Sequence, residues 1–217
     1  MISKIIKGRG MQGVVAYAMD GDHRAIIGGN LAGRTPRQLS REFGQFRKLR
    51  PTLDRAVAHL ILSAAPEDPP LDADAWNRIA GIFLDDLGYQ SCPHVIFRHN
   101  DTGNDHIHIT CLRIRPDGKT VPDSNDRFKA ERSLARIARG LVQLGVRQLV
   151  VAGGETSGAC VQALQIAQLQ IGPQIDPGVP WCHARCPDAA NGGLHLTLKS
   201  GNFGTDDFFN KAFTMLA

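Results

Sequence analysis

Residues 94–114 read HVIFRHNDTGNDHIHITCLRI, in which two apolar runs flank a short polar segment. The runs His94–His99 and His106–Ile114 are rich in β-branched and aromatic residues, which favour strands. The segment between them, residues 100–105, is NDTGND, and Asn, Asp and Gly are the residues that turns prefer. The stretch therefore predicts two antiparallel strands joined as a β-hairpin.

Three histidines fall within ten residues of this hairpin. Side chains alternate between the two faces of a strand, so His106 and His108 project to the same side while Ile107 points to the core. His99 ends the neighbouring strand beside them. Three imidazoles in reach of one divalent cation would leave coordination positions open, as a catalytic site requires. The alternative is that one or two of them are surface histidines, but their spacing favours a metal site.

Other polar residues near the hairpin are candidates for support of this site. Asp101 and Asp105 are placed where they could orient the ligand imidazoles from behind. His59 begins another apolar run, His59–Ser63, and both a structural and a supporting role are open for it.

The chain has two tyrosines, Tyr17 and Tyr89, as candidate nucleophiles. A phenol, with a pKa of about 10, attacks poorly at neutral pH, and a divalent metal that polarises a phosphate would favour its attack. Tyr17 lies in the most basic part of the chain, whereas Tyr89 follows Gly88 at an expected helix end and is interpreted as a packing residue. The residues alone favour Tyr17 only slightly over a core role.

Composition sets the broad class. The chain has 217 residues, enough for one domain or two small ones, and it has no apolar run of the roughly 20 residues that span a bilayer. We expect a cytoplasmic protein without a membrane partner.

Five scattered cysteines argue against a disulfide framework. Positive charge is concentrated at the start: residues 1–58 carry 11 Lys/Arg against 4 Asp/Glu, and residues 138–217 carry 5 of each.

The remaining pattern indicates an α/β protein throughout. Thr35 and Pro36 begin an expected helix that runs to Lys48, and Asp72–Leu87 has apolar residues at helical spacing. Further on, the expected strands are 146–151 and 194–198, the expected helices are 127–144, 159–164 and 206–216, and residues 172–180 are expected to form turns.

Two glycine-rich segments, Gly153–Gly158 and Lys199–Gly204, each lie between an expected strand and an expected helix. Such loops present backbone N–H groups to an anion. One loop alone is more often an ordinary tight turn, and no Walker motif is present. Two loops together favour a cradle for nucleotide phosphates.

The N-terminal part resembles the relaxase/mobilization nuclease family of the MobP type, within the HUH endonucleases. The matching stretches, over residues 1–137, are Gly13–Tyr17, Ile26–Gly33, Thr35–Arg37, His59–Ser63, the histidine cluster and Asp123–Asp126. The resemblance implies an antiparallel-rich sheet carrying helices, in the HUH arrangement.

The same resemblance implies a reaction. Tyr17 would attack the scissile phosphate of single-stranded DNA at a plasmid origin of transfer, remain linked to the 5′ phosphate and release a 3′ hydroxyl. His99, His106 and His108 would hold the metal, Mg²⁺ or Mn²⁺, that polarises this phosphate. Other mobilization proteins are further implied partners in conjugation.

Residues 138–217 resemble the C-terminal nucleotide-binding domain of the four-carbon acid sugar kinase family. The matching stretches are Val150–Gly158, Ile171–Pro173, Asp176–Trp181 and Leu198–Gly204. This resemblance implies ATP as a ligand of a small α/β segment, with contacts from both glycine-rich loops: Gly153, Gly154, Glu155, Thr156, Lys199, Ser200, Gly201 and Asn202. The family's acceptor-binding domain is not among the matching stretches.

Three functions compete on this basis. The first is a DNA-nicking transesterase, the second is an ATP-binding portion of a sugar-acid kinase, and the third is a gene fusion with no activity. We rank the first highest because its nucleophile and its metal ligands are all present, whereas the kinase part lacks its acceptor site.

Overall fold

The computed structural model describes residues 2–19, 24–64, 71–99, 105–200, 203–205 and 207–215. The chain forms two compact units, residues 1–127 and residues 128–217. Helix α4 (Asp126–Gln143) begins at this division, and the expected boundary at residue 137 falls inside the helix.

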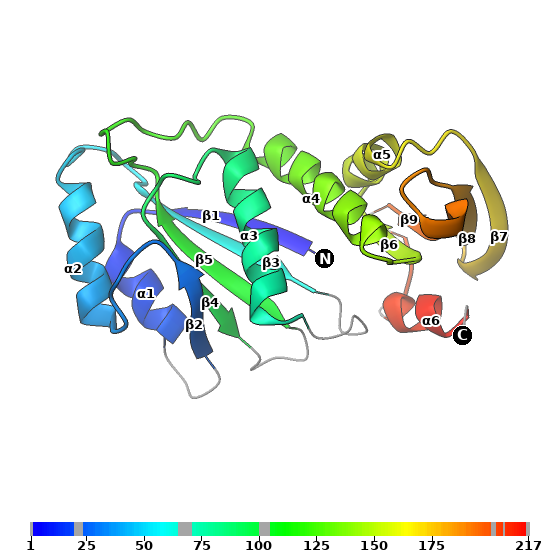
Figure 1. Ribbon diagram of the computed structural model, residues 1–217, viewed down its shortest axis with the longest axis horizontal. Coiled ribbons are helices and arrows are strands. Elements are labelled where there is room, and N and C mark those ends of the chain that lie inside the picture. Colours follow the sequence, from blue (N-terminus) through cyan, green and yellow to red (C-terminus); the bar gives the residue numbers. More distant parts are fainter. Residues whose placement is uncertain are drawn as a thin grey trace. The chain divides into compact units, whose positions relative to one another are not determined.

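The first unit is built on a five-stranded sheet in which every neighbouring pair of strands is antiparallel. This confirms the expected antiparallel-rich sheet with helices, and the pairing of β4 with β5 confirms the two strands of the expected hairpin. In spatial order the strands are β1 (Ile2–Gly8), β3 (Val57–Ser63), β5 (His106–Leu112), β4 (His94–His99) and β2 (Arg24–Gly29) (Figure 1).

Three helices accompany this sheet: α1 (Met11–Met19), α2 (Pro36–Arg47) and α3 (Ala73–Leu87). Helix α2 begins where Thr35 and Pro36 predict, with a capping box between the Thr35 and Gln38 side chains and backbones. Helix α3 begins at Asp72, whose carboxylate accepts from the Ala75 N–H at 2.7 Å. It ends at Gly88, whose left-handed φ of 80° suits glycine.

The two faces of the sheet bury different side chains, because successive strand residues alternate. Val95 and Phe97 of β4 pack in a core cluster with Val15 of α1 and Phe43 of α2. Arg98, between Phe97 and His99, points to the opposite face. Figure 1 shows α3 lying across one face of the sheet. The even-numbered residues of β5, His106 and His108 among them, therefore share the face that α1 covers.

The second unit has a four-stranded mixed sheet. Strand β6 (Gln148–Ala152) runs parallel to β9 (Gly193–Lys199), and the other neighbouring pairs are antiparallel, in the order β6, β9, β8 (Val179–Arg185), β7 (Leu169–Asp176). Helix α5 (Gly154–Ala163) follows β6, a 3-10 turn spans Ala190–Gly192, and α6 (Phe208–Thr214) follows β9. Ala135 and Ala138 of α4 pack with Val151 and Cys160. The α/β class expected for this part is confirmed.

Two local predictions in this unit were wrong. Helix α5 begins at Gly154 rather than at residue 159, because Gly153 takes a positive φ of 103° and its carbonyl accepts from the Ser157 N–H at 2.8 Å. Residues 172–180, expected as turns, belong mostly to β7 and β8, which turn over at Gly178 (φ 77°). Pro173 is tolerated there because β7 is an edge strand with irregular pairing at that point.

All five cysteines are buried free thiols, which confirms that they form no disulfide framework. Among the residues that the structure describes, no helix combines the length and apolar character needed to cross a bilayer.

Candidate metal and tyrosine site

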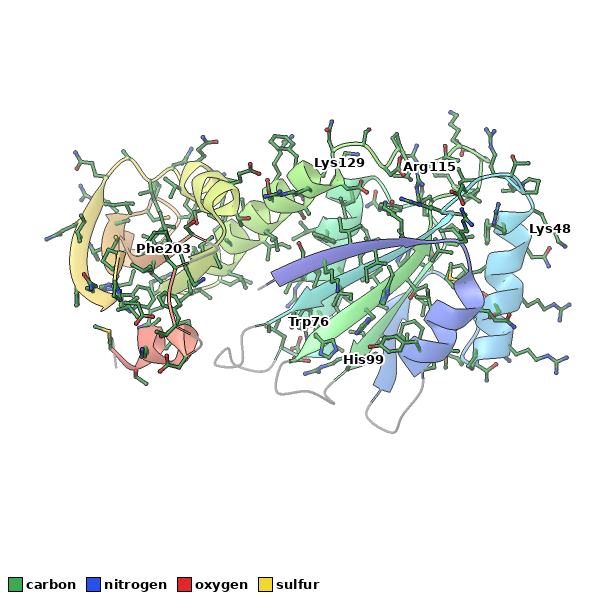
Figure 2. All side chains as sticks on the ribbon, turned by 180° about the vertical axis from the view of Figure 1, so that it is seen from behind. Lys48, Trp76, His99, Arg115, Lys129 and Phe203 are labelled. Atoms are coloured by element: carbon green, nitrogen blue, oxygen red, sulfur yellow. The ribbon has the colours of Figure 1, made fainter. Side chains whose placement is uncertain are left out.

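Strand pairing brings the three histidines of the hairpin together. His99 lies directly opposite His106 across the β4–β5 pair, and His108 lies two residues further along β5. The His108 ring centroid is 4.2 Å from that of His99 and 5.0 Å from that of His106, and the His99 and His106 centroids are 5.3 Å apart. One nitrogen from each ring lies within 4.8 Å of the other two. Figure 2 shows His99 at one end of the sheet, beside α1.

The donor set fits a cation. Metal–imidazole bonds of about 2.0–2.1 Å place the donors of one ion roughly 3–4 Å apart, so small side-chain adjustments from this arrangement suffice. His99 and His108 are almost fully buried, whereas His106 is half-buried. All three donors are nitrogens, which favours a transition-metal ion over Mg²⁺, because Mg²⁺ prefers oxygen ligands.

Helix α1 is tied to this cluster through the backbone. His99 Nε2 lies 3.0 Å from the carbonyl oxygen of Ala18. A carbonyl can only accept, so Nε2 carries the hydrogen and Nδ1 keeps the lone pair that a cation needs. The contact also fixes the end of α1, which carries Tyr17, against the sheet.

Tyr17 and Tyr89 have different surroundings. The Tyr17 side chain is 55% exposed, and its ring centroid is 5.9 Å from that of His108. Tyr89 is fully buried, and its hydroxyl lies 2.5 Å from Lys7 Nζ, which also pairs with Asp126 at 2.7 Å. Burial raises the pKa of the Tyr89 phenol well above its usual value. Tyr89 is thus a packing residue, and Tyr17 is the tyrosine beside the histidines.

His59, for which the sequence left two roles open, lies next to the cluster. Its Nε2 is 2.6 Å from His108 Nδ1, and the two rings are stacked with centroids 4.8 Å apart. Burial, with a smaller contribution from the nearby His99, lowers the pKa of His59 to about 4, so the imidazole is neutral at pH 7. No local sequence motif predicts this contact, because it joins residues that are 49 positions apart in the sequence.

The supporting role expected for Asp105 is corrected by its contacts. Its carboxylate accepts from Arg98 Nε and Nη2 and from Trp76 Nε1, each at 2.9 Å. Asp105 directly precedes His106, so its side chain lies on the opposite face of the sheet from the ligand imidazoles. It anchors α3 to the hairpin instead. Asp101, the other aspartate expected to orient the ligands, lies outside the described residues.

In the second unit the two glycine-rich segments meet. They follow the carboxyl ends of β6 and β9, which are adjacent and parallel, and the Gly153 N–H donates to the Lys199 carbonyl at 2.7 Å. Gly154, Glu155 and Thr156 form the first turn of α5. Ser200 follows β9, whereas Gly201 and Asn202 lie outside the described residues. The end of two parallel strands is where open α/β sheets bind ligands.

The segment after the second loop is held by Asp176. This carboxylate is 5% exposed, and it accepts from the Thr205 N–H and hydroxyl, both at 2.8 Å, and from Lys211 Nζ at 3.3 Å. The Thr205 backbone hydrogen bond, followed by the other partners, lowers the pKa of the Asp176 carboxyl. Asp176 thus fixes Thr205 to the end of β7.

These contacts predict a pH dependence of the second unit. A carboxyl whose pKa is lowered by folding stabilises the unit fully above the unfolded pKa, and this contribution is lost as the pH falls through the folded pKa. We expect the thermal midpoint of this unit to fall as the pH drops below about 4, the pKa of an aspartate in an unfolded chain. The midpoint is followed by the signal of the Trp181 indole N–H, which donates to the Ala212 carbonyl at 2.7 Å. Asp176→Asn should lower the midpoint at pH 7 and flatten the fall. An unchanged pH profile in the variant would contradict this role.

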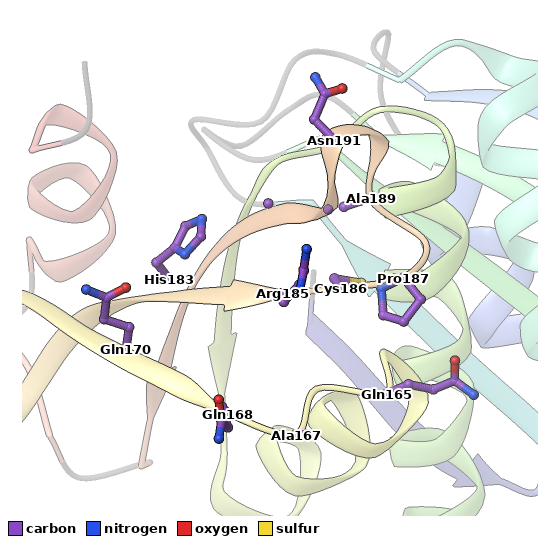
Figure 3. A pocket seen from close by; sticks show the side chains of 12 residues that line it. Gln165, Ala167, Gln168, Gln170, His183, Arg185, Cys186, Pro187, Ala189 and Asn191 are labelled. Carbon is purple, nitrogen blue, oxygen red and sulfur yellow. The ribbon is translucent and has the colours of Figure 1, made fainter.

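A pocket of about 820 Å³ opens elsewhere in the second unit (Figure 3). Gln168, Gln170, His183 and Arg185 contribute polar side chains to its wall. None of the residues predicted to contact nucleotide lines it. The pocket is therefore separate from the glycine-rich loops.

Two family models match the chain, and each covers more than half of it. The MobA/VirD2-like nuclease domain of the relaxases matches residues 17–140, and the nucleotide-binding C-terminal domain matches residues 99–209. The chain belongs to both families. It is thus a chimera, as its sequence motifs predict, and the two matches overlap over residues 99–140.

Curated relatives match the kinase-like part. A 3-oxo-tetronate kinase of Burkholderia multivorans is 60% identical over 86 residues, which are 40% of this chain and 19% of the relative. The 3-oxo-tetronate kinase of Haemophilus influenzae is 48% identical over 82 residues, which are 38% of this chain and 19% of the relative. The chain thus spans about a fifth of the length of these relatives.

Solved structures match over a similar share of the chain. A Haemophilus influenzae protein is 42% identical, with a TM-score of 0.39, over 42% of this chain and 21% of its own. A Bordetella bronchiseptica domain with bound citrate, a domain-swapped dimer, is 27% identical, with a TM-score of 0.36, over 42% of this chain and 22% of its own.

Proposed function

We propose that the first unit nicks single-stranded DNA at a plasmid origin of transfer by transesterification to Tyr17. The observation that carries this proposal is the juxtaposition of an exposed phenol with three clustered imidazoles: the Tyr17 ring lies 5.9 Å from that of His108. Membership of the relaxase family supports it.

The reaction exchanges one phosphodiester for another. The Tyr17 oxygen bonds to phosphorus as the phosphorus–O3′ bond breaks, the phenolic proton passes to water, and the released 3′ oxygen takes up a proton. The 5′ phosphate stays on Tyr17, so the bond energy is retained for rejoining and no nucleotide cofactor is needed. Tyr17 can reach a strand because it is exposed, and the His99–Ala18 contact holds its helix in place.

His99, His106 and His108 would hold the divalent ion. When bound, the ion supplies a Lewis acid that polarises the scissile phosphate and stabilises charge as it develops. Their nitrogen donors make Mn²⁺ a better probe than Mg²⁺.

Exposed basic side chains of the first unit support a DNA partner. Arg37, Arg41 and Lys48, on and after α2, are exposed, and Figure 2 shows Lys48 pointing outward. Such side chains neutralise backbone phosphates, so binding of a strand should weaken steeply with salt. Other mobilization proteins would be partners of the same reaction.

The test is covalent capture. The full chain is incubated with Mn²⁺ and a randomised pool of 5′-labelled and 3′-labelled single-stranded oligonucleotides, and denaturing gels follow label that moves with the protein. The proposal expects an adduct that carries only the 3′ label, because the protein keeps the 5′ phosphate. An adduct with the 5′ label, or none from the whole pool, would contradict it.

Nucleotide binding by the second unit is a second candidate function. It is favoured by the contact between the two loops, Gly153 to Lys199 at 2.7 Å, and by the identity with the 3-oxo-tetronate kinases. The proposal is limited to ATP binding, since the acceptor site of a kinase is not part of the match.

Gly154→Glu tests this second function. Space around Gly154 is open and its φ is ordinary, and an acidic residue suits the first turn of a helix, so α5 should stay folded. Its carboxylate would repel phosphates, and we expect ATP affinity to fall at least tenfold in calorimetry. Gly140→Glu in α4, equally open, is the matched control and should bind as the natural chain does. Equal affinity in all three proteins would place ATP elsewhere.

A further inference from the structure

Among the residues that the structure describes, His59 is the imidazole beside the metal site that the reaction above does not use. It lies on β3, where it pairs with Thr110, and its ring stacks on that of His108 from the neighbouring strand. Both side chains are more than nine-tenths buried. Its Nε2 lies 2.6 Å from His108 Nδ1, which is a hydrogen-bond distance.

A hydrogen bond between two neutral imidazoles needs an N–H on one ring and a lone pair on the other. If His108 Nδ1 donates, its Nε2 keeps a lone pair and can bind a cation. If His59 Nε2 donates, His108 carries its hydrogen on Nε2 and cannot bind through that atom. The tautomer of the pair therefore decides whether His108 is a ligand.

We propose that His59 accepts from His108 Nδ1–H and so holds His108 as an Nε2 ligand, an inference that rests on the metal site of the proposed function. His59 is then a positioning residue and not a fourth ligand, because its Nε2 is already engaged with His108. The His59 ring is in turn a tautomer with its hydrogen on Nδ1.

The neighbouring ligand shows the same arrangement. His99 Nε2 donates to the Ala18 carbonyl at 3.0 Å, which leaves Nδ1 for the cation. Each buried ligand thus has its second nitrogen fixed by the protein, His99 by α1 and His108 by β3. Such outer partners orient ligands and tune their affinity, and their loss typically weakens metal binding by about 10–100-fold.

Two variants separate positioning from direct ligation. His59→Gln places an amide oxygen near the position of Nε2, and this oxygen can still accept from His108 Nδ1–H. His59→Leu removes the acceptor. By calorimetry with Mn²⁺ on the full chain, we expect the Leu variant to bind about 10–100-fold more weakly and the Gln variant to stay within about fivefold of the natural chain. His94→Leu, on β4 outside the cluster, is the control and should bind unchanged.

A spectroscopic readout needs no variant. Nitrogen-15 shifts of the imidazoles, recorded with Zn²⁺ as a diamagnetic probe, should show His108 with hydrogen on Nδ1 and metal on Nε2, and His59 without metal.

A metal-bound His59, equal losses of Mn²⁺ affinity in the Gln and Leu variants, or no loss in either variant would overturn the proposal. A natural chain that binds neither ion would instead refute the metal site itself, whereas absent nicking with intact binding would refute only the nickase.

Discussion

Tyr17→Phe should abolish the covalent DNA adduct, with a loss of more than about 1,000-fold in the rate of its formation. The substitution removes the one oxygen that becomes bonded to phosphorus, and removal of a nucleophile is among the largest single-residue effects on catalysis. The side chain is 55% exposed and its ring is kept, so the fold should not change. The measurement is the 3′-labelled adduct on a denaturing gel, in Mn²⁺, over time.

Metal binding separates this loss from damage to the site. Tyr17→Phe should bind Mn²⁺ with the natural affinity, since the three clustered imidazoles that would hold the ion are all kept. Tyr89→Phe is the matched control: it removes the hydroxyl that contacts Lys7, so it should melt at a lower temperature, yet it should form the adduct. Adduct formation by Tyr17→Phe, or its loss in a folded Tyr89→Phe, would reassign the nucleophile.

The hairpin and its histidines were predictable because both follow from local pattern. The alternation of His106, Ile107 and His108 predicts the shared face of the two histidines, and the turn-forming composition of residues 100–105 predicts that β5 pairs antiparallel with β4. The structure places His99 opposite His106, as this reasoning predicts. The same alternation explains why Asp105 does not orient the ligands. Asp105 directly precedes His106, so its side chain lies on the opposite face of the sheet, where it contacts Arg98 and Trp76.

His59 shows what local pattern cannot supply. Its contact with His108 depends on the pairing of β3 with β5. This pairing is set by the tertiary structure of the sheet, because the two histidines are 49 residues apart in the sequence. The start of α5 was misplaced for a related reason: glycines at 153, 154 and 158 indicate a loop, but of these three only Gly153 takes a positive φ. Tertiary packing overrides weak local preference in both cases.

His106→Ala should reduce Mn²⁺ affinity at least 100-fold and, with it, adduct formation to the level of Tyr17→Phe. One of the three clustered donors is lost, and Asp105, the carboxylate next to it in the chain, faces away from the cluster and cannot replace it. His106 is the ligand of choice for this test. It is half-buried, whereas His99 is buried and holds α1 through Ala18, so its removal would also disturb the helix that carries Tyr17.

The expected pattern across variants is what distinguishes a metal-assisted phenol from a phenol acting alone. His106→Ala should lose metal and adduct together, Tyr17→Phe should lose only the adduct, and His94→Ala, on the same sheet but outside the cluster, should lose neither. If His106→Ala kept the adduct while losing Mn²⁺, the imidazoles would be a structural cluster, and the charge on the phosphate would have to be met by the exposed arginines of α2. Calorimetry and the adduct gel on the same protein samples decide between these outcomes.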